Sequence, residues 1–400
     1  MSGCGCYNWD HGAVNRYYFD HNATTPVADE VLAVLNLVLR EAIGNPSSVH
    51  REGQLARHRV EEARRRVAIF LGCAPADIVL TSGGTEANNL AVLGAVRASG
   101  KRNRHVITTA IEHPAVLNPC AQLQQEGVSV SYVEVSSDGV VDPDDIRREI
   151  RSNTVLISVM HANNETGAIQ PIERVGRIAR EHDVLFHVDG VQASGKLPVD
   201  VKQIPADLYS ISAHKFYAPK GAGALYAGKG VKLQPLQYGG RHERERRAGT
   251  ENVPGLAAMG AAAELAGRLL AKEMPRQEEL RDRLERGILE RVPQAAANSG
   301  TVHRIANTTN IRFDGIDGEA LVVALDLRGF AVSSGSACSS GAVEPSHVLM
   351  AMGLSPQQAR SSIRFSLGRQ NTSEQVDGLT DAVVECAAHL RRLSPAYGHG

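Results

Sequence analysis

Residues 210–223, with the sequence SISAHKFYAPKGAG, begin within an apolar, β-prone run at Leu208–Ile211 and lead into a turn rich in proline and glycine. Lys215, at the centre of this stretch, is therefore expected at the end of a strand or on the loop after it. An ammonium held among apolar neighbours tends to lose its proton, and a neutral lysine forms Schiff bases with carbonyl compounds. A lone lysine in such a stretch is usually a surface residue whose stem covers its aromatic neighbours, so the role of Lys215 depends on the residues that precede it.

The chain ahead of Lys215 alternates strand-like and helix-like segments. We predict strands at Ile78–Thr81, His105–Thr109, Val128–Val135, Thr154–Met160 and Val184–Val188, with helices between them. This alternation indicates βαβ units and a mostly parallel sheet with helices on both faces. The sequence therefore predicts an α/β fold, whose ligands bind beyond the carboxyl ends of the strands.

The residues after the sheet predict a second, smaller α/β unit. An alanine-rich helix at Leu256–Ala271 is expected to link the two units, and a separate charged helix follows to about Arg291. Beyond it we predict a few short elements, which are strands at Asn310–Phe313, Phe330–Ser333 and Ile363–Ser366 and a helix at Glu319–Leu327. The expected division is a large domain at 24–265 and a small domain formed by 1–23 and 266–400.

Composition limits the possible functions. With 42% hydrophobic and 22% charged residues, the chain of 400 residues resembles ordinary soluble globular proteins. A net charge of −1 gives no general attraction to nucleic acid or to an anionic membrane. The most apolar long stretch, Leu256–Leu270, is interrupted by charges and too short to span a bilayer, and residues 1–16 lack the apolar core of a signal peptide. We expect a cytoplasmic protein that binds neither nucleic acid nor membranes.

The six cysteines are sparse and irregularly spaced, at positions 4, 6, 73, 120, 338 and 386. This spacing does not indicate a disulfide framework. Cys4 and Cys6 form a C-x-C pair that could bind metal or sulfur, but no second pair of ligands lies near it in the sequence. We therefore predict no resident metal site.

Polar clusters follow several of the predicted strands. The first is TSGGTE, residues 81–86, where glycines including Gly84 permit close approach of a ligand and the next helix offers free N–H groups to a phosphate. His113 and the sequence HANNETG, residues 161–167, follow later strands. Asp189 closes the apolar run VLFHV, so it is either a turn cap or a counter-charge for a cationic ring nitrogen.

Together these clusters match the requirements of one cofactor. Pyridoxal phosphate needs an anion site, a surface on which its ring stacks, a partner for its protonated pyridine nitrogen and a covalent lysine anchor. The glycine-rich turn, His113, Asp189 and Lys215 supply these in a consistent order along the chain. The sequence therefore predicts a pyridoxal-phosphate site.

The chain also resembles a known family, the cysteine desulfurases, which are class-V, pyridoxal-phosphate-dependent enzymes of the aspartate-aminotransferase fold (fold type I). The likeness extends from about Tyr18 to at least Arg369. It rests on the motifs FDHNATTP, TSGGTEANN, EHPAV, HANNETG, VDGVQASGK, SAHKFYAPKG, RRAGTENVPG, SSGSACSSGAVEPSH and SIRFSLGR. RRAGTENVPG and the Cys338 region are most similar to the nitrogen-fixation type, whereas the charges of RHERERR, with His242, depart from the usual family pattern.

The resemblance implies a role for each matching residue. Lys215 would be the Schiff-base lysine and move the Cα proton, His113 would stack on the ring and assist, and Cys338 would be the nucleophile. The cofactor would be bound by Gly84, Thr85, His113, Asn164, Asp189, Gln192, Ser212, His214 and Lys215, and by Thr250 from the other subunit of a homodimer. Arg364, with Asn164, would bind the substrate carboxylate through the forked guanidinium geometry.

Cys338 lies in a segment dominated by serine and glycine, SSGSACSSGAVEPS, which is typical of an exposed loop. Beside a cofactor site, such a thiol is suited to attack the substrate and then carry cargo away. The resemblance implies that L-cysteine becomes L-alanine and that its sulfur becomes a persulfide on Cys338. An iron–sulfur scaffold or another acceptor protein would then take the sulfur, and Cys338 would contact an iron–sulfur cluster at most transiently.

Two other kinds of function remain compatible with these residues. One is a selenocysteine lyase or an aminotransferase of the same fold, neither of which has an evident need for Cys338. The other is a non-catalytic protein that carries sulfur or binds a partner, which the complete set of Lys215, Asp189, His113 and Arg364 argues against.

Overall fold

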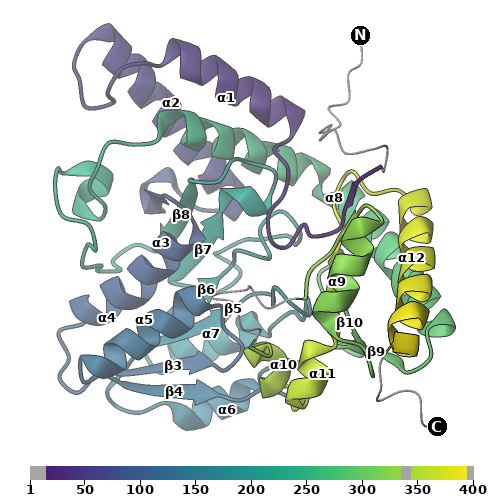
Figure 1. The fold of residues 1–400 in the computed structure, drawn as a ribbon. Helices are drawn as coiled ribbons and strands as arrows, with labels where there is room; N and C mark the ends of the chain where they lie inside the picture. Colours follow the sequence, from purple (N-terminus) through teal and green to yellow (C-terminus); the bar gives the residue numbers. More distant parts are fainter. Residues whose placement is uncertain (1–14, 335–343, 394–400) are drawn as a thin grey trace.

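The structure is a computed structural model that describes residues 15–334 and 344–393. Cys4, Cys6 and Cys338 lie outside the described residues. A seven-stranded sheet with the strand order β2-β8-β7-β6-β5-β3-β4 forms the centre of the larger part of the molecule (Figure 1). Its strands are β2 (Ile78–Thr81), β3 (His105–Thr109), β4 (Ser129–Val133), β5 (Thr154–Met160), β6 (Leu185–Asp189), β7 (Leu208–Ser212) and β8 (Gly223–Ala227).

Strands β3 to β7 pair in parallel, and β8 runs antiparallel to both of its neighbours, β7 and β2. Every residue of β2, β3, β5 and β7 is buried, as expected for strands covered on both faces. This confirms the predicted α/β class with a mostly parallel sheet. The sequence analysis did not predict β8.

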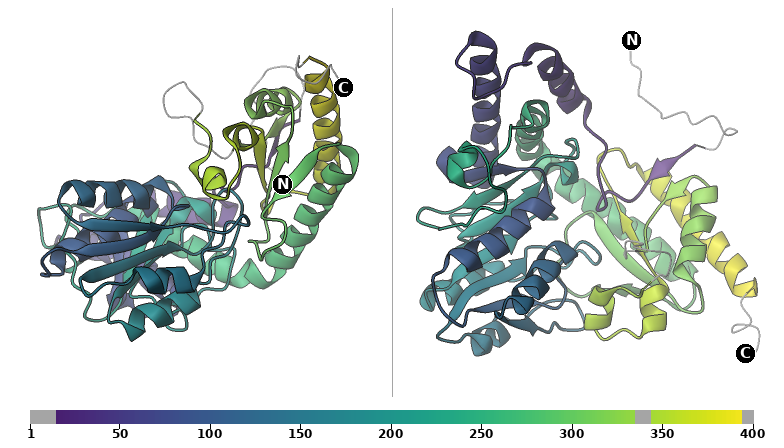
Figure 2. Two further views of the ribbon diagram at one scale, coloured as in Figure 1. Left: turned by 90° about the horizontal axis from the view of Figure 1, so that it is seen from below. Right: turned by 60° about the vertical axis from the view of Figure 1, so that its left-hand side comes forward.

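Helices cover both faces of this sheet, as the view along its edge shows (Figure 2, left). They are α1 (Asp29–Glu41), α2 (Arg51–Leu71), α3 (Gly84–Asn89), α4 (Ala95–Ala98), α5 (Pro114–Gln125), α6 (Pro143–Glu149) and α7 (Ile172–Glu181). A π-helical segment at Leu90–Gly94 joins α3 and α4, so the chain is helical from Gly84 to Ala98. Gly72 ends α2 with φ of 73°, a left-handed conformation that favours glycine.

The smaller part has its own core and a three-stranded antiparallel sheet with the order β12-β10-β9. Its strands are β9 (Ala295–Asn298), β10 (Thr308–Phe313) and β12 (Ser362–Ser366), and a separate pair joins β1 (Tyr17–Tyr18) to β11 (Phe330–Ala331). Its helices are α9 (Gly318–Leu327), α10 (His347–Ala351), α11 (Pro356–Arg360) and α12 (Ser373–Leu393). The domain boundaries at 23/24 and 265/266 stay a prediction.

One long helix, α8 (Val253–Arg291), connects the two cores (Figure 2, left). The sequence predicts two separate helices here, and this prediction is wrong. Pro275 removes a backbone donor from the helix interior, but the first half of α8 packs in the core of the large sheet and the second half in the smaller core. This packing holds the helix continuous through the proline. Among the described residues, no helix is long and apolar enough to cross a membrane.

His187 provides a test of the packing within the large sheet. Its ring lies between β5 and β7, with Nδ1 2.8 Å from Ser158 Oγ and Nε2 3.0 Å from Ser210 Oγ. Burial lowers the pKa of His187 to about 3. The unfolded chain, with an ordinary histidine pKa of about 6.5, therefore binds a proton that the native state excludes as the pH falls below that value.

We predict that His187→Asn lowers the free energy of unfolding at neutral pH but makes it less sensitive to acid. Below pH ~6.5, the free energy of unfolding of the wild-type protein should fall by about 1.4 kcal/mol per pH unit through His187. The variant should lack this contribution. Urea unfolding at a series of pH values between neutral and about 5 measures the slope. Equal slopes for the two proteins would show that His187 is not held neutral.

Candidate active site

A cavity of about 800 Å³ lies at the carboxyl ends of the parallel strands, between the two cores. All of the predicted site residues but two line it, namely Gly84, Thr85, His113, Asn164, Asp189, Gln192, Ser212, His214, Lys215 and Arg364. They lie at or soon after the ends of five strands of the large sheet, β2, β3, β5, β6 and β7, and on β12 of the smaller one. The fold therefore brings together residues that are up to 280 positions apart in the chain (Gly84 to Arg364).

Lys215 ends a short 3₁₀ turn, Ala213–Lys215, that directly follows β7. Its Nζ donates hydrogen bonds to the backbone carbonyl oxygens of Asn22, at 2.6 Å, and Ala23, at 2.8 Å. Burial lowers the pKa of the Lys215 amine to about 8, and the nearby Arg364 guanidinium acts in the same direction. A substantial fraction of the amine is therefore neutral near physiological pH, as Schiff-base chemistry requires.

Asp189 is the last residue of β6 and is 5% exposed. Its Oδ2 accepts a hydrogen bond from Asn88 Nδ2 at 2.7 Å, and its Oδ1 accepts one from the Val191 N–H at 3.0 Å. Burial raises the pKa of Asp189, while the His113 imidazole and these hydrogen bonds oppose the rise. A cationic ring nitrogen in the cavity would give this carboxylate the counter-charge it needs.

Tyr209 lies directly against the backbone beside Asp189. A Cβ atom on Gly190 would be 2.0 Å from Tyr209 Cε1, so only glycine fits after the aspartate. The Tyr209 hydroxyl also lies 2.9 Å from His161 Nδ1. Asn88 thus holds the Asp189 carboxylate, and Tyr209 packs against the next residue, Gly190. Neither was assigned a role from the sequence, although Asn88 belongs to the quoted motif TSGGTEANN.

His113 caps the N-terminus of α5, where its Nδ1 accepts a hydrogen bond from the Ala115 N–H at 3.0 Å. Burial lowers the pKa of His113. With Nδ1 acting as an acceptor, the proton of the neutral ring lies on Nε2. The ring is thus held in one tautomer at the wall of the cavity.

The remaining corner of the cavity is suited to a phosphate. A Cβ atom on Gly84 would come within 2.8 Å of Val191 Cγ2 and 3.2 Å of Ser212 Cβ, so glycine keeps this corner open. The first turn of a helical segment presents N–H groups without intrahelical partners there, together with the hydroxyls of Thr85 and Ser212. His214 closes the corner with Nδ1 3.1 Å from Thr24 Oγ1, and burial lowers its pKa to about 4.

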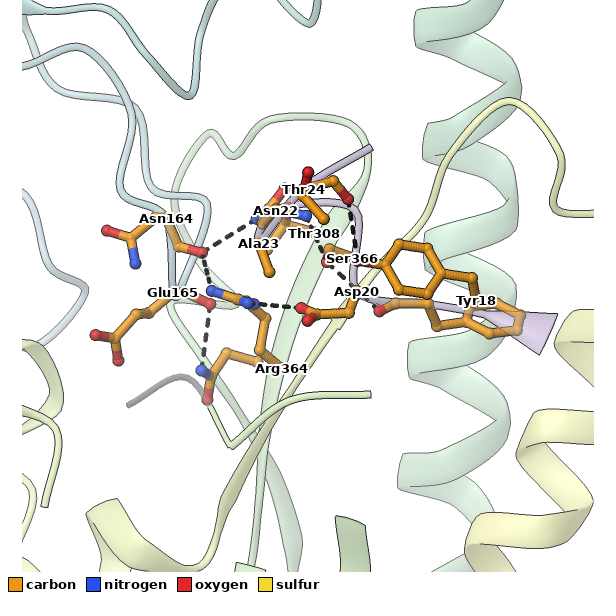
Figure 3. A network of polar contacts seen from close by, with 12 residues as sticks. Tyr18, Asp20, Asn22, Ala23, Thr24, Asn164, Glu165, Thr308, Arg364 and Ser366 are labelled. Atoms are coloured by element: carbon orange, nitrogen blue, oxygen red, sulfur yellow. Dashed lines mark hydrogen bonds and ion pairs between the residues drawn. The ribbon is translucent and has the colours of Figure 1, made fainter. Parts of the chain in front are cut away.

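Arg364 reaches the cavity from β12 and is 4% exposed. One of its terminal nitrogens donates to Asp20 Oδ1 at 2.7 Å and the other to the Asn164 carbonyl oxygen at 3.0 Å (Figure 3). Within the described part of the chain, its Nε has no hydrogen-bond partner. A guanidinium carries five N–H donors, so donors remain for a substrate carboxylate after these two bonds.

The two other predicted site residues are not in this cavity. Thr250 is exposed and lines a separate small pocket with Thr81 and Ser82. Cys338 lies outside the described residues, so its predicted role is untested. The chain resumes at Glu344, and Ser346 then donates a hydrogen bond of 2.5 Å to the buried Glu165.

Two residues beside the cavity were missed by the sequence analysis. The backbone carbonyl oxygen of Asn22 accepts a hydrogen bond from the Lys215 amine, and Lys196 Nζ donates a hydrogen bond to Gln192 Oε1 at 2.6 Å. Both belong to quoted motifs, FDHNATTP and VDGVQASGK, and this was the only signal available in the sequence.

The fold and the cavity define a pyridoxal-phosphate-dependent enzyme of fold type I. The cavity offers a lysine of lowered pKa, a strand-end carboxylate, a histidine wall and a glycine-lined phosphate corner, so the residues fit the cofactor. Residues 17–379 match the model of the aminotransferase class-V family. The chain belongs to this family, whose members use pyridoxal phosphate, and its relatives place it among the cysteine desulfurases.

Those relatives match almost the whole chain. "Cysteine desulfurase IscS" of Methanosarcina thermophila is 46% identical over 378 residues, which cover 94% of this chain and 93% of the relative. "Cysteine desulfurase" of a Nostoc species is also 46% identical and covers 94% of each chain. A solved "NIFS-LIKE PROTEIN" is 39% identical with a TM-score of 0.88 and covers 94% of this chain and 100% of its own. A second, "SspA in complex with cysteine", is 37% identical with a TM-score of 0.79, over 88% of this chain and 98% of its own.

We predict that covalent attachment of pyridoxal phosphate to the cofactor-free protein follows the neutral form of Lys215. The attachment rate should rise about tenfold per pH unit below a midpoint near 8 and level off above it, because the amine is then deprotonated. Borohydride reduction at timed intervals, followed by peptide mass spectrometry, measures modification at Lys215. A rate that keeps rising to pH ~10.4, the ordinary lysine value, would contradict the lowered pKa.

Proposed function

We propose that this chain is a cysteine desulfurase that converts L-cysteine into L-alanine and transfers the sulfur to Cys338 as a persulfide. The observation that carries the proposal is the single cavity in which the Lys215 amine, the Asp189 carboxylate and the Arg364 guanidinium meet. The relatives named cysteine desulfurase, which match along nearly the full length, support the choice of substrate.

The residues of the cavity suggest how the reaction is divided among them. Arg364 and Asn164 hold the substrate carboxylate, which places the Cα–H bond near Lys215. Pyridoxal phosphate, when bound, supplies the electron sink for the charge that develops at Cα. Lys215, in its neutral form, takes the Cα proton, and Asp189 with its partner Asn88 stabilises the positive ring nitrogen.

The sulfur transfer is a displacement at the substrate sulfur. The thiolate of Cys338 attacks that sulfur, an S–S bond forms, and the C–S bond breaks with its electron pair remaining on the carbon side. Protonation of Cβ and Cα then gives alanine, and Cys338 holds the persulfide. The neutral His113, with its proton on Nε2, is placed to assist these proton transfers.

We further propose that the protein acts as a homodimer in the cytoplasm. Thr250 is exposed and outside the cavity of its own chain, which supports a contact with the phosphate bound by a second copy. The proposed acceptor of the sulfur is an iron–sulfur scaffold or another sulfur-acceptor protein.

Replacing Cys338 by alanine should abolish sulfide release from L-cysteine in the presence of a thiol reductant. The variant lacks the nucleophile, so we expect activity to fall by at least about a hundredfold, while the covalent link between Lys215 and the cofactor stays intact. Cys73→Ala, at a half-buried position remote from the cavity, is the matched control and should retain activity. Full sulfide production by the Cys338 variant would remove the persulfide step and favour a lyase.

Arg364→Lys tests the carboxylate site. Lysine keeps the positive charge but loses the forked donor geometry and cannot bond to Asp20, Asn164 and the substrate together. We expect kcat/KM for cysteine to fall roughly tenfold to more than a hundredfold, which corresponds to a loss of about 1.5–3 kcal/mol of transition-state stabilisation. Most of the change should be in KM. Steady-state kinetics measure the two parameters, and an unchanged KM would exclude Arg364 from carboxylate binding.

A further inference from the structure

Asn22, in the turn between β1 and α1, is 1% exposed although it is surrounded by the polar groups of the cavity. Its backbone N–H donates to Ser366 Oγ at 3.0 Å. Its carbonyl oxygen accepts from Lys215 Nζ at 2.6 Å and from Gln192 Nε2 at 3.0 Å. The backbone of Asn22 thus contacts two cavity-lining side chains.

The side-chain amide of Asn22 also makes hydrogen bonds with both of its polar atoms. Its Nδ2 donates to the Asn164 carbonyl oxygen at 3.1 Å and to Thr308 Oγ1 at 2.8 Å. Its Oδ1 accepts from Lys196 Nζ at 2.8 Å and from Asn307 Nδ2 at 3.2 Å. A primary amide offers two donors and two acceptor lone pairs, so its full capacity is used. Neither aspartate, which has no donors when ionised, nor alanine can reproduce this set.

The Asn164 carbonyl oxygen connects Asn22 to Arg364. It accepts one hydrogen bond from Asn22 and a second, of 3.0 Å, from the Arg364 guanidinium (Figure 3). Asn22 therefore holds the Lys215 amine through its own carbonyl and reaches Arg364 through one shared acceptor. The proton-transfer group and the carboxylate-binding group are in this way fixed to the same residue.

We propose that Asn22 is a positioning residue that sets the Lys215 amine and the Arg364 guanidinium relative to each other. The proposal deepens the desulfurase function and rests on it for the consequence in catalysis. Asn22 itself does not react.

The contacts of Asn22 also join the two cores. Thr308 lies on β10 and is paired in register with Ser366 on β12, the strand that carries Arg364. Asn22 bonds to Thr308, Ser366 and the neighbouring Asn307 of the smaller part, while its other partners belong to the loops of the large sheet. A small displacement of one core against the other would thus be transmitted to the Lys215 amine through Asn22.

Lys196 also holds the side chain of Asn22 in place. Its Nζ bridges Asn22 Oδ1 and Gln192 Oε1, at 2.8 and 2.6 Å. Burial, with the nearby charges of Lys215 and Arg364, lowers the pKa of Lys196. It therefore serves as a hydrogen-bond donor that orients both amides.

The test compares three variants in the cofactor-free full-length protein and, in parallel, in the holoenzyme. Asn22→Ala removes the whole amide. Thr308→Val removes one acceptor of Asn22 and one donor to Asn307, which itself bonds to Asn22, and neither Thr308 nor Asn307 lines the cavity. Asn298→Ala is the matched control, because Asn298 is another buried asparagine whose Nδ2 donates to Asn310 Oδ1 and Ser362 Oγ, and it lines no part of the cavity.

The first measurement needs no catalysis. The rate at which acetic anhydride modifies Lys215 in the cofactor-free protein, followed by peptide mass spectrometry against pH, gives the midpoint of deprotonation. We expect a wild-type midpoint near 8 and an upward shift of about one pH unit in Asn22→Ala, because water enters the space left by the amide and relieves the burial that lowers the pKa of the amine, while the backbone carbonyl acceptors remain. Thr308→Val should shift in the same direction by less, and Asn298→Ala should not shift.

The second measurement is cysteine turnover by the holoenzyme. Asn22→Ala should lower kcat about tenfold to a hundredfold and also raise KM, because the Lys215 amine and the Arg364 guanidinium are no longer held in a fixed position relative to each other. Asn298→Ala should lose a comparable free energy of unfolding while keeping both constants. If the wild-type protein releases no alanine from cysteine, the proposed function fails, and the acetylation profile still decides the role of Asn22.

The proposal is overturned if Asn22→Ala is destabilised as much as Asn298→Ala but keeps the wild-type midpoint of Lys215 and the wild-type kcat. If Asn22→Ala does not fold, Thr308→Val decides the question. An unchanged acetylation profile in Thr308→Val would then assign Asn22 a purely structural role.

Discussion

The rest of the site depends on keeping the Lys215 amine largely dehydrated and partly neutral at physiological pH. Burial lowers its pKa, while the carboxylates of Asp20 and Asp189 act in the opposite direction. Each carboxylate is engaged elsewhere, Asp20 with the Arg364 guanidinium and Asp189 with the Asn88 amide. Because their charges are partly compensated by these partners, the two carboxylates can lie beside the cavity without restoring the ordinary pKa of the lysine.

The fold meets this requirement by collecting strand ends. Parallel pairing places the residues that follow β3, β5, β6 and β7 along one edge of the sheet, which brings His113, Asn164, Asp189 and Lys215 together. Arg364 comes from the smaller sheet, so the cavity also depends on how the two cores are joined. The unbroken helix α8 and the hydrogen bonds of Asn22 make that connection.

The alternation of apolar runs and helical segments allowed the α/β class to be predicted and placed Gly84, His113, Asp189 and Lys215 near strand ends, whereas the other cavity-lining residues were expected only from the family resemblance. It could not reveal the partners of those residues. Asn88 and Asp189 are 101 positions apart and Asn22 and Lys215 are 193 apart, so nothing in local spacing relates them. The continuity of α8 through Pro275 was also mispredicted, since the packing that overrides the proline comes from two distant cores. The roles of the predicted site residues, Cys338 and Thr250 among them, stay predictions.

The central claim is that this cavity removes sulfur from cysteine and leaves alanine. The most direct test incubates the purified holoenzyme with L-cysteine and a thiol reductant, and quantifies alanine, sulfide and pyruvate in the same sample. The account predicts alanine and sulfide in equal amounts and no pyruvate. Pyruvate in place of alanine, or a product that forms only with an added keto acid and without sulfide, would contradict it.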